Sequence, residues 1–117
     1  MGSFSFSKEE RIAKRAEFID VSLHGTRYYT KNFVVILKQN RGDSTRLGIT
    51  VSKRVGNSVK RNRIKRSIRE FFRLSKQQIP RGYDIVVIAL KESDKCTSLK
   101  VQEELGDLLL RNHALFS

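Results

Sequence analysis

The feature that most constrains this chain is a strongly basic segment at residues 53–81. This segment holds eleven Lys or Arg residues and a single acid, Glu70, in a chain of 117 residues with a formal net charge of +12. Such a density of like charge cannot enter a core, so it must lie on the surface and is best explained by a polyanionic partner, most often a nucleic acid. A merely solvated helix face is the alternative, but such a face normally intersperses Glu residues as ion-pair partners.

The same segment has the periodicity of an amphipathic helix from about residue 58 to residue 75. One predicted face is apolar and consists of Ile64, Ile68, Phe71 and Phe72. The opposite face, at about 100° per residue, is a straight polar seam of Asn62, Arg66, Arg69 and Arg73. Arg binds phosphate oxygens bidentately and stacks on bases, and Asn can hydrogen-bond a base edge or a sugar hydroxyl. The pattern therefore predicts one face for the core and one for RNA.

The predicted start of this helix has an unusual charge. Gly56-Asn57-Ser58 offers capping residues, and the first turn or so then carries Lys60, Arg61 and Arg63. Cations at this end oppose the helix dipole and cost roughly a few tenths of a kcal/mol each. An anion docked there would gain from both the dipole and the cations, so this end is predicted to face an anionic partner.

The N-terminal third predicts another helix and a pair of strands. The helix extends from about residue 8 to residue 23, with Ser7 as N-cap and Gly25 at its end. Its inward stripe is predicted to be Ile12, Ala16, Ile19 and Leu23. Strands are predicted at 33–39 and 46–52, and the short turn between them makes an antiparallel hairpin. There is room for a further short strand near Arg27 to Thr30.

The C-terminal part predicts a buried strand and a last helix. The strand at 84–91 contains a continuous apolar run, which suits a strand covered on both faces. The helix, over about 98–113, directs four residues to the core, Val101, Leu105, Leu108 and Leu109. The order of helix, strands, helix, strand and helix predicts one α+β domain over residues 1–117, with helices packed on a small sheet.

Several protein classes are excluded by what the sequence lacks. No apolar run approaches the roughly 18 residues of a membrane span, so no membrane partner is expected. Residues 1–7 are too short and polar for a secretory signal, and the lone Cys96 offers no disulfide, so we expect a cytoplasmic protein. No paired carboxylates, metal-ligand cluster or nucleophile motif appears, so neither catalytic residues nor a metal site is predicted in the chain.

Residues 52–70, from Ser52-Lys53-Arg54 through Arg61-Asn62-Arg63 to Arg69-Glu70, closely resemble the signature segment of the bacterial ribonuclease P protein subunit. The resemblance extends to Arg46-Leu47-Gly48-Ile49 and to the strand at 84–89, and Ala16-Glu17-Phe18 and His24-Gly25 fit the family's first helix. It implies an α/β sandwich with a four-stranded central sheet and a left-handed crossover through the basic helix.

The resemblance also implies a function. Family members pair with a large catalytic RNA that, with bound Mg²⁺, hydrolyses the phosphodiester joining the 5′ leader to the tRNA. The protein helps to bind precursor tRNA, contacts the leader and favours productive metal binding. We therefore expect a protein that is inactive alone, joins its RNA as a monomer in a one-to-one complex, and leaves Mg²⁺ mainly to the RNA.

Site residues follow from the basic segment and from the resemblance. The predicted RNA-binding residues are Lys53, Arg54, Asn57, Lys60, Arg61, Asn62, Arg63, Lys65, Arg66, Arg69 and Arg73. The predicted cleft for the single-stranded leader contains Phe18, Ile36 and Ser52. Phe18 is equally compatible with core packing. Many family members carry a Tyr at the position of Ile36 and a second aromatic where this chain has Ser22; Tyr28 and Tyr29 are candidates to compensate.

Two other functions fit a basic chain of this kind. The first is a ribosomal or general RNA-binding protein with no link to a nuclease, which stimulation of a ribonuclease P RNA would distinguish. The second is a membrane-surface helix, which is disfavoured because the apolar face of residues 58–75 is needed for the core.

Overall fold

The computed structural model describes residues 11–111 and 113–116. Its helices are α1 (Arg15–His24), α2 (Ser58–Ser75) and α3 (Ser98–Leu109), and its strands are β1 (Thr26–Tyr29), β2 (Phe33–Gln39), β3 (Arg46–Val51) and β4 (Tyr83–Ala89). Short 3₁₀ turns lie at Lys53–Val55, Lys91–Lys95 and His113–Phe116. The strands form one mixed sheet in the order β1-β2-β4-β3, which confirms the α+β prediction. No described helix is long and apolar enough to cross a membrane.

The predicted hairpin between β2 and β3 is wrong, because β4 lies between these two strands. β4 pairs antiparallel with β2 and parallel with β3, and Val87 is the partner of both Val35 and Ile49. The physical reason is burial. The run from Tyr83 to Val87 is buried along its whole length, so β4 takes the centre of the sheet, where both faces are covered. β3 contains an exposed Thr50 and is left as an edge strand.

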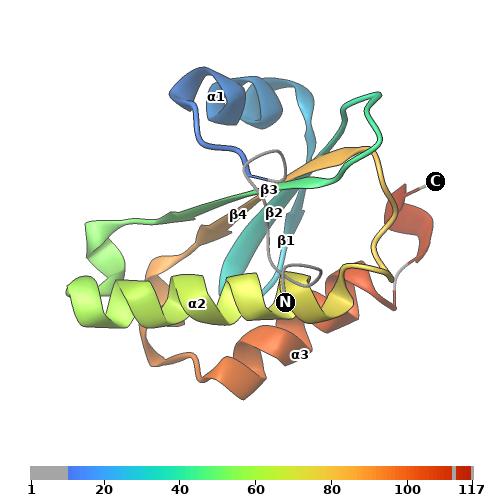
Figure 1. The fold of residues 1–117 in the computed structure, drawn as a ribbon. Coiled ribbons are helices and arrows are strands. Elements are labelled where there is room, and N and C mark those ends of the chain that lie inside the picture. Colours follow the sequence, from blue (N-terminus) through green and yellow to red (C-terminus); the bar gives the residue numbers. More distant parts are fainter. Residues whose placement is uncertain (1–10, 112, 117) are drawn as a thin grey trace.

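The sheet separates two layers of helices (Figure 1). On one face, α1 packs Val21 against Val34, Ile36 and Val86 in a small cluster. On the other face, α2 and α3 cover the larger cluster, whose centre is formed by Phe33, Val35, Ile68, Ile85, Val101 and Leu105. The alternation of side chains along β2 and β4 thus supplies two separate apolar layers.

Helix α2 forms where the sequence predicts it. The Asn57 side chain accepts a hydrogen bond from the Lys60 amide at 3.0 Å and caps the first turn. All four predicted apolar residues are buried, Ile64, Ile68, Phe71 and Phe72. The Ser67 and Ser98 hydroxyls lie 2.9 Å apart and join α2 to α3. With its apolar face in the core, α2 presents its basic face outward.

Helix α1 is shorter than predicted, because it begins at Arg15 rather than near residue 8. Ser7, the predicted N-cap, lies outside the described residues. Ile12 is buried as expected, but in an extended segment, where its amide donates to the Leu47 carbonyl at 3.0 Å on the edge of β3. Ile19 and Leu23 are exposed, so the predicted stripe is also wrong, and Val21 is the buried residue of α1.

Helix α3 ends four residues before the predicted end. The amides of Leu110 and Arg111 both donate to the Gly106 carbonyl, at 2.9 and 3.2 Å, and this shared acceptor closes the helix. Val101, Leu105 and Leu109 are buried as predicted, and Leu108 is half-buried. The core contribution of α3 is therefore as the sequence predicts.

One turn residue gives a stability prediction. Arg41 has a φ of 61°, a left-handed conformation that an unbranched charged side chain adopts at a cost and that Asn tolerates better. Arg41→Asn is expected to raise the free energy of unfolding by about 0.5 kcal/mol. Urea denaturation measures this, with Arg81→Asn in the neighbouring loop as the charge-matched control. A gain of the same size in the control would contradict the backbone explanation.

Candidate nucleic-acid interface

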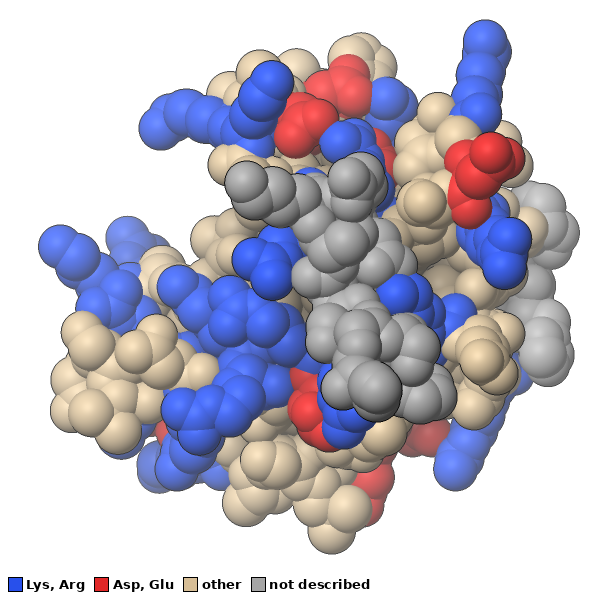
Figure 2. Space-filling view, in the orientation of Figure 1, with Lys and Arg blue, Asp and Glu red and all other residues tan. Residues whose placement is uncertain are grey.

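The exposed face of α2 carries most of the predicted RNA-binding residues. Those that are exposed are Lys53, Arg54, Asn57, Lys60, Asn62, Arg63, Arg66 and Arg69, whereas Arg61, Lys65 and Arg73 are half-buried. Figure 2 shows Lys and Arg side chains gathered over α2 with few acidic side chains among them. The structure therefore brings the predicted basic residues of the helix and of the Lys53–Val55 turn onto one surface.

Acidic partners are nearly missing from this surface. Glu70 is the one carboxylate among the 18 residues of α2. It pairs with Arg73, whose Nε lies 3.0 Å from Oε1, and hydrogen bonding to Arg73 lowers the pKa of Glu70. Arg66 and Arg69 form no ion pair with any residue in the described part of the chain. Arg73 is thus partly neutralised, whereas Arg66 and Arg69 keep their full charge for a ligand.

The N-terminal end of α2 has the geometry of an anion site. Asn57 caps the helix through Lys60, and no acidic residue occupies the first turn. The Arg61 guanidinium donates to the Ser58 hydroxyl at 3.3 Å and forms no ion pair with a described residue. The helix dipole and the nearby cations therefore act in the same direction on an approaching anion.

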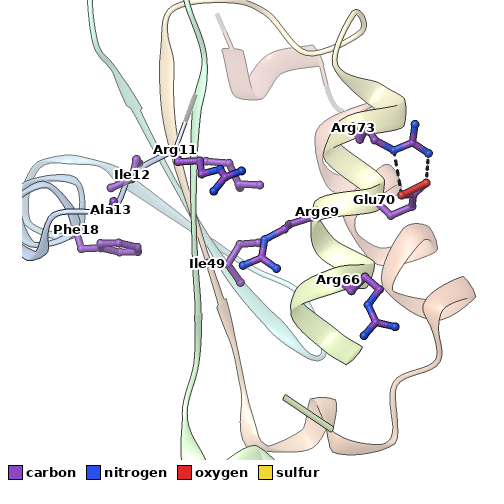
Figure 3. Close-up of a pocket in the computed structure, with 10 residues that line it drawn as sticks. Arg11, Ile12, Ala13, Phe18, Ile49, Arg66, Arg69, Glu70 and Arg73 are labelled. Carbon is purple, nitrogen blue, oxygen red and sulfur yellow. Dashed lines mark hydrogen bonds and ion pairs between the residues drawn. The ribbon is translucent and has the colours of Figure 1, made fainter. Parts of the chain in front are cut away.

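A groove of about 360 Å³ lies between α1, the edge of β3 and α2. Its apolar lining includes Ile12 and Phe18 on the α1 side of β3 and Ile49 on the α2 side. Its rim includes three Arg residues of α2, Arg66, Arg69 and Arg73. In Figure 3, Phe18 points toward β3 from the side of α1, and Arg69 reaches toward Ile49 from α2. The groove thus unites a residue predicted for the leader cleft with residues predicted for the basic helix.

Phe18 is a packing residue and a groove residue at once. Its ring lies over Gly48, where a Cβ atom would come within 2.7 Å of the ring. The side chain is nevertheless only half-buried and lines the groove. Phe18 therefore packs against the sheet and still presents part of its ring to the groove.

Ile36 is not available to a ligand, so its placement in the cleft is corrected. It has no exposed surface, because the end of α1 lies directly on it. A Cβ atom on Gly25 would approach Ile36 Cγ2 to 2.7 Å, which shows how closely this turn covers β2. Tyr28 packs into the cluster on the opposite face and cannot compensate, whereas Tyr29, the register partner of Val34, is exposed. Ser52 is exposed and accepts a hydrogen bond from the Arg54 amide at 3.3 Å.

The position of α1 depends on charged residues to which the sequence assigned no such role. Arg46 of β3 donates through Nε and Nη2 to the two carboxylate oxygens of Asp84, at 2.9 and 2.7 Å, and through Nη1 to Glu17 of α1 at 2.6 Å. Lys38 pairs with Asp20 of α1 at 2.5 Å. These contacts lower the pKa of Glu17 and of Asp20. In the sequence, the one sign of this ion pair is that Arg46 and Asp84 lie near the starts of two predicted strands.

The described residues do not form a metal site of their own. Within residues 11–111 and 113–116, no three His, Cys, Asp or Glu side chains are placed to hold a metal ion. On the basic face, the single carboxylate of Glu70 is occupied by Arg73. No step of the chemistry can therefore be assigned to a metal bound by these residues.

The sequence is similar to those of known proteins over a range that includes this basic segment. The sequence model of the family described as Ribonuclease P matches residues 6–113. The ribonuclease P protein component of Desulforapulum autotrophicum is 47% identical over 108 residues, covering 92% of each chain.

The fold is also similar to those of solved protein structures. The ribonuclease P protein of Staphylococcus aureus superposes with a TM-score of 0.83 at 39% identity, covering 92% of this chain and 98% of that one. The Thermotoga maritima protein gives a TM-score of 0.79 at 38% identity, covering 87% and 96%. The match thus spans the basic helix, the groove and the sheet that supports them, and the chain belongs to the ribonuclease P protein family.

Proposed function

We propose that this protein is the RNA-binding subunit of a ribonucleoprotein endonuclease that removes the 5′ leader from precursor tRNA. The observation that carries the proposal is the exposed basic face of α2, where Arg66 and Arg69 have no acidic partner in the described chain. Family membership supports a partnership with a ribonuclease P RNA. In this proposal the face of α2 binds the catalytic RNA, and the groove at Phe18 contacts the substrate.

The chemistry in this proposal belongs to the RNA. Mg²⁺ prefers oxygen ligands and usually keeps several bound water molecules. The phosphate oxygens of the RNA, together with water, supply such ligands. The protein contributes by lowering the repulsion between two polyanions, the catalytic RNA and the precursor tRNA, which reduces the Mg²⁺ concentration that the particle needs. A monomer bound one-to-one to its RNA in the cytoplasm completes the proposal.

A reconstitution experiment tests this function. The full chain is mixed with a ribonuclease P RNA and a precursor tRNA at low Mg²⁺, and release of the leader is followed. We expect cleavage that neither the RNA nor the protein gives alone. Absence of stimulation, with the protein still binding RNA, would favour a general RNA-binding protein without a nuclease role.

The role of Phe18 gives a second prediction. Phe18→Ala is expected to lower the affinity of the reconstituted particle for precursor tRNA by at least about fivefold, because stacking on an aromatic ring contributes roughly 1–3 kcal/mol per base. Affinity for mature tRNA, which has no leader, is expected to stay nearly unchanged. Equilibrium binding of both substrates measures the difference, and equal losses on the two would contradict a leader contact.

A further inference from the structure

Helix α1 is attached to the sheet by little apolar contact for an element that helps to line a groove. It lies by itself on its face of the sheet (Figure 1), and among its ten residues only Val21 is buried. A surface helix normally packs about three or four apolar side chains per two turns. The position of α1 on the sheet must therefore depend strongly on polar contacts.

Arg46 makes one of these contacts from a rigid base. Its Nε and Nη2 atoms donate to the two carboxylate oxygens of Asp84, and its Nη1 atom donates to Glu17 of α1 at 2.6 Å. Asp84 is buried and accepts a further hydrogen bond from Asn40 at 2.8 Å. A planar guanidinium held bidentately on one edge presents its remaining donor in a fixed direction. The sheet therefore determines where Glu17 can lie.

Glu17 and the next residue, Phe18, contact neighbouring positions of β3. Side chains at positions i and i+2 of a strand share one face, so Arg46 and Gly48 lie side by side. Arg46 binds Glu17, and the Phe18 ring lies over Gly48, where a Cβ atom would come within 2.7 Å of the ring. The ion pair and the ring contact together attach α1 to β3 at two adjacent points.

We infer that Arg46 is a positioning residue for the substrate, because through Glu17 it holds α1 on β3 and fixes the Phe18 ring where the 5′ leader passes. The inference rests on the proposed function, in which Phe18 contacts the leader. A ring that is held in place before binding loses little freedom on binding, so it contributes more affinity than a ring on a loosely held helix. Neither Arg46 nor Glu17 needs to touch the RNA.

The sign of the charge effect makes Glu17→Ala a sharp test. Removing an acid raises the affinity for RNA by electrostatics alone. We expect the opposite for precursor tRNA, which the reconstituted particle should bind about threefold more weakly because the Phe18 ring loses its support. Affinity for mature tRNA, and affinity of the protein for the catalytic RNA, are expected not to fall. Glu17→Gln keeps an acceptor for Arg46 and is expected to retain most of the affinity.

Two further variants separate positioning from a change of charge. Arg46→Lys keeps the charge, but an ammonium group on a flexible stem does not fix Asp84 and Glu17 in one geometry, so the same leader-specific loss is expected. Asp107→Ala is the matched control, because it removes one acid from an exposed pair with Arg111 on α3. It is expected to leave the contribution of the leader to affinity unchanged.

Combining Glu17→Ala with Phe18→Ala tests the route by which Glu17 acts. If Glu17 acts through Phe18, the double variant binds precursor tRNA no more weakly than Phe18→Ala alone. Leader-specific losses in Glu17→Ala and Arg46→Lys that disappear in the Phe18→Ala background would support the inference.

The contrary outcomes are distinguishable. An unchanged or higher affinity of Glu17→Ala for precursor tRNA, with Phe18→Ala still impaired, would overturn the inference and leave the proposed function standing. Losses that multiply with those of Phe18→Ala, or that are equal for mature tRNA, would mean that Glu17 supports the fold as a whole and would also overturn it. Failure of the wild-type protein to stimulate cleavage by the RNA would overturn the proposed function and the inference with it.

Discussion

Replacing Arg46 by Met is expected to lower the free energy of unfolding by about 3 kcal/mol at neutral pH. Arg46 binds both carboxylate oxygens of Asp84, whose side chain is 4% exposed. Without the guanidinium, a buried carboxylate keeps only the hydrogen bond from Asn40 at 2.8 Å. Removing one partner of a buried pair is costly because the other charge stays desolvated.

The loss of unfolding free energy in Arg46→Met is expected to depend on pH. Burial raises the pKa of Asp84, but hydrogen bonds from Arg46 and Asn40 outweigh burial and hold the pKa below its usual value. Stability from this carboxylate is therefore present above the unfolded-state pKa and is lost as the pH falls through the folded-state pKa. In Arg46→Met burial prevails, the pKa rises, and protonation of Asp84 reduces the penalty in mild acid.

Urea denaturation at pH 7 and at about pH 4.5 measures both effects. Lys38→Met is the matched control, because it also removes a cation that anchors α1, but from a pair whose side chains are 30% and 47% exposed. Exposed pairs contribute little, so the control is expected to lose much less stability. An equal loss in the two variants, or a loss from Arg46→Met that does not shrink in acid, would contradict the account of Asp84.

A triple substitution on the outer face of α2, Arg63→Gln with Arg66→Gln and Arg69→Gln, is expected to give the largest change in RNA affinity. If about five phosphates are neutralised, wild-type affinity falls roughly 100-fold between about 50 and 200 mM salt. Removing three of the five phosphate contacts reduces this salt-dependent fall in affinity to about sevenfold over the same range. It also lowers the affinity at about 0.1 M salt by roughly 100-fold.

The salt dependence separates electrostatic loss from damage to the fold. The affinities of wild type and triple variant are expected to converge toward 1 M salt, because the lost term is counterion release. A control with Lys31, Arg41 and Lys95 changed to Gln removes the same net charge from exposed positions outside α2. Filter binding or fluorescence titration measures the slopes. A control slope as shallow as that of the triple variant would mean that net charge, and not the face of α2, governs binding.

The parts of the fold that the sequence predicted well are those decided by local interactions. The limits of α2 follow from the Asn57 cap and from apolar residues three and four positions apart, all within one segment. The strand from Phe33 to Gln39 follows in the same way from its own residues. The basic face was equally predictable, since it is the other side of a helix whose core side is already known.

The parts that were predicted wrongly depend on partners distant in sequence. The pairing of β3 with β4 rather than β2 is decided by which strand is buried on both faces. Helix α1 begins late because Ile12 is pulled to the edge of β3, and α1 is then held by Arg46 and Lys38. The burial of Ile36 depends on the close approach of Gly25. None of these contacts produces a periodic pattern in the sequence, so the sequence does not predict them.

The insertion of β4 between β2 and β3 has a consequence for synthesis on the ribosome. β3 has its strand partner in β4, and the two are separated in the chain by the whole of α2. A nascent chain that ends before Tyr83 can form the β1–β2 pair, but it contains no partner strand for β3. In such a chain α2 also has no complete sheet to pack on. Non-local pairing of this kind is slow, because a long loop must close before any contact is gained. The surface proposed for RNA thus becomes a fixed platform only when nearly the whole chain has been made.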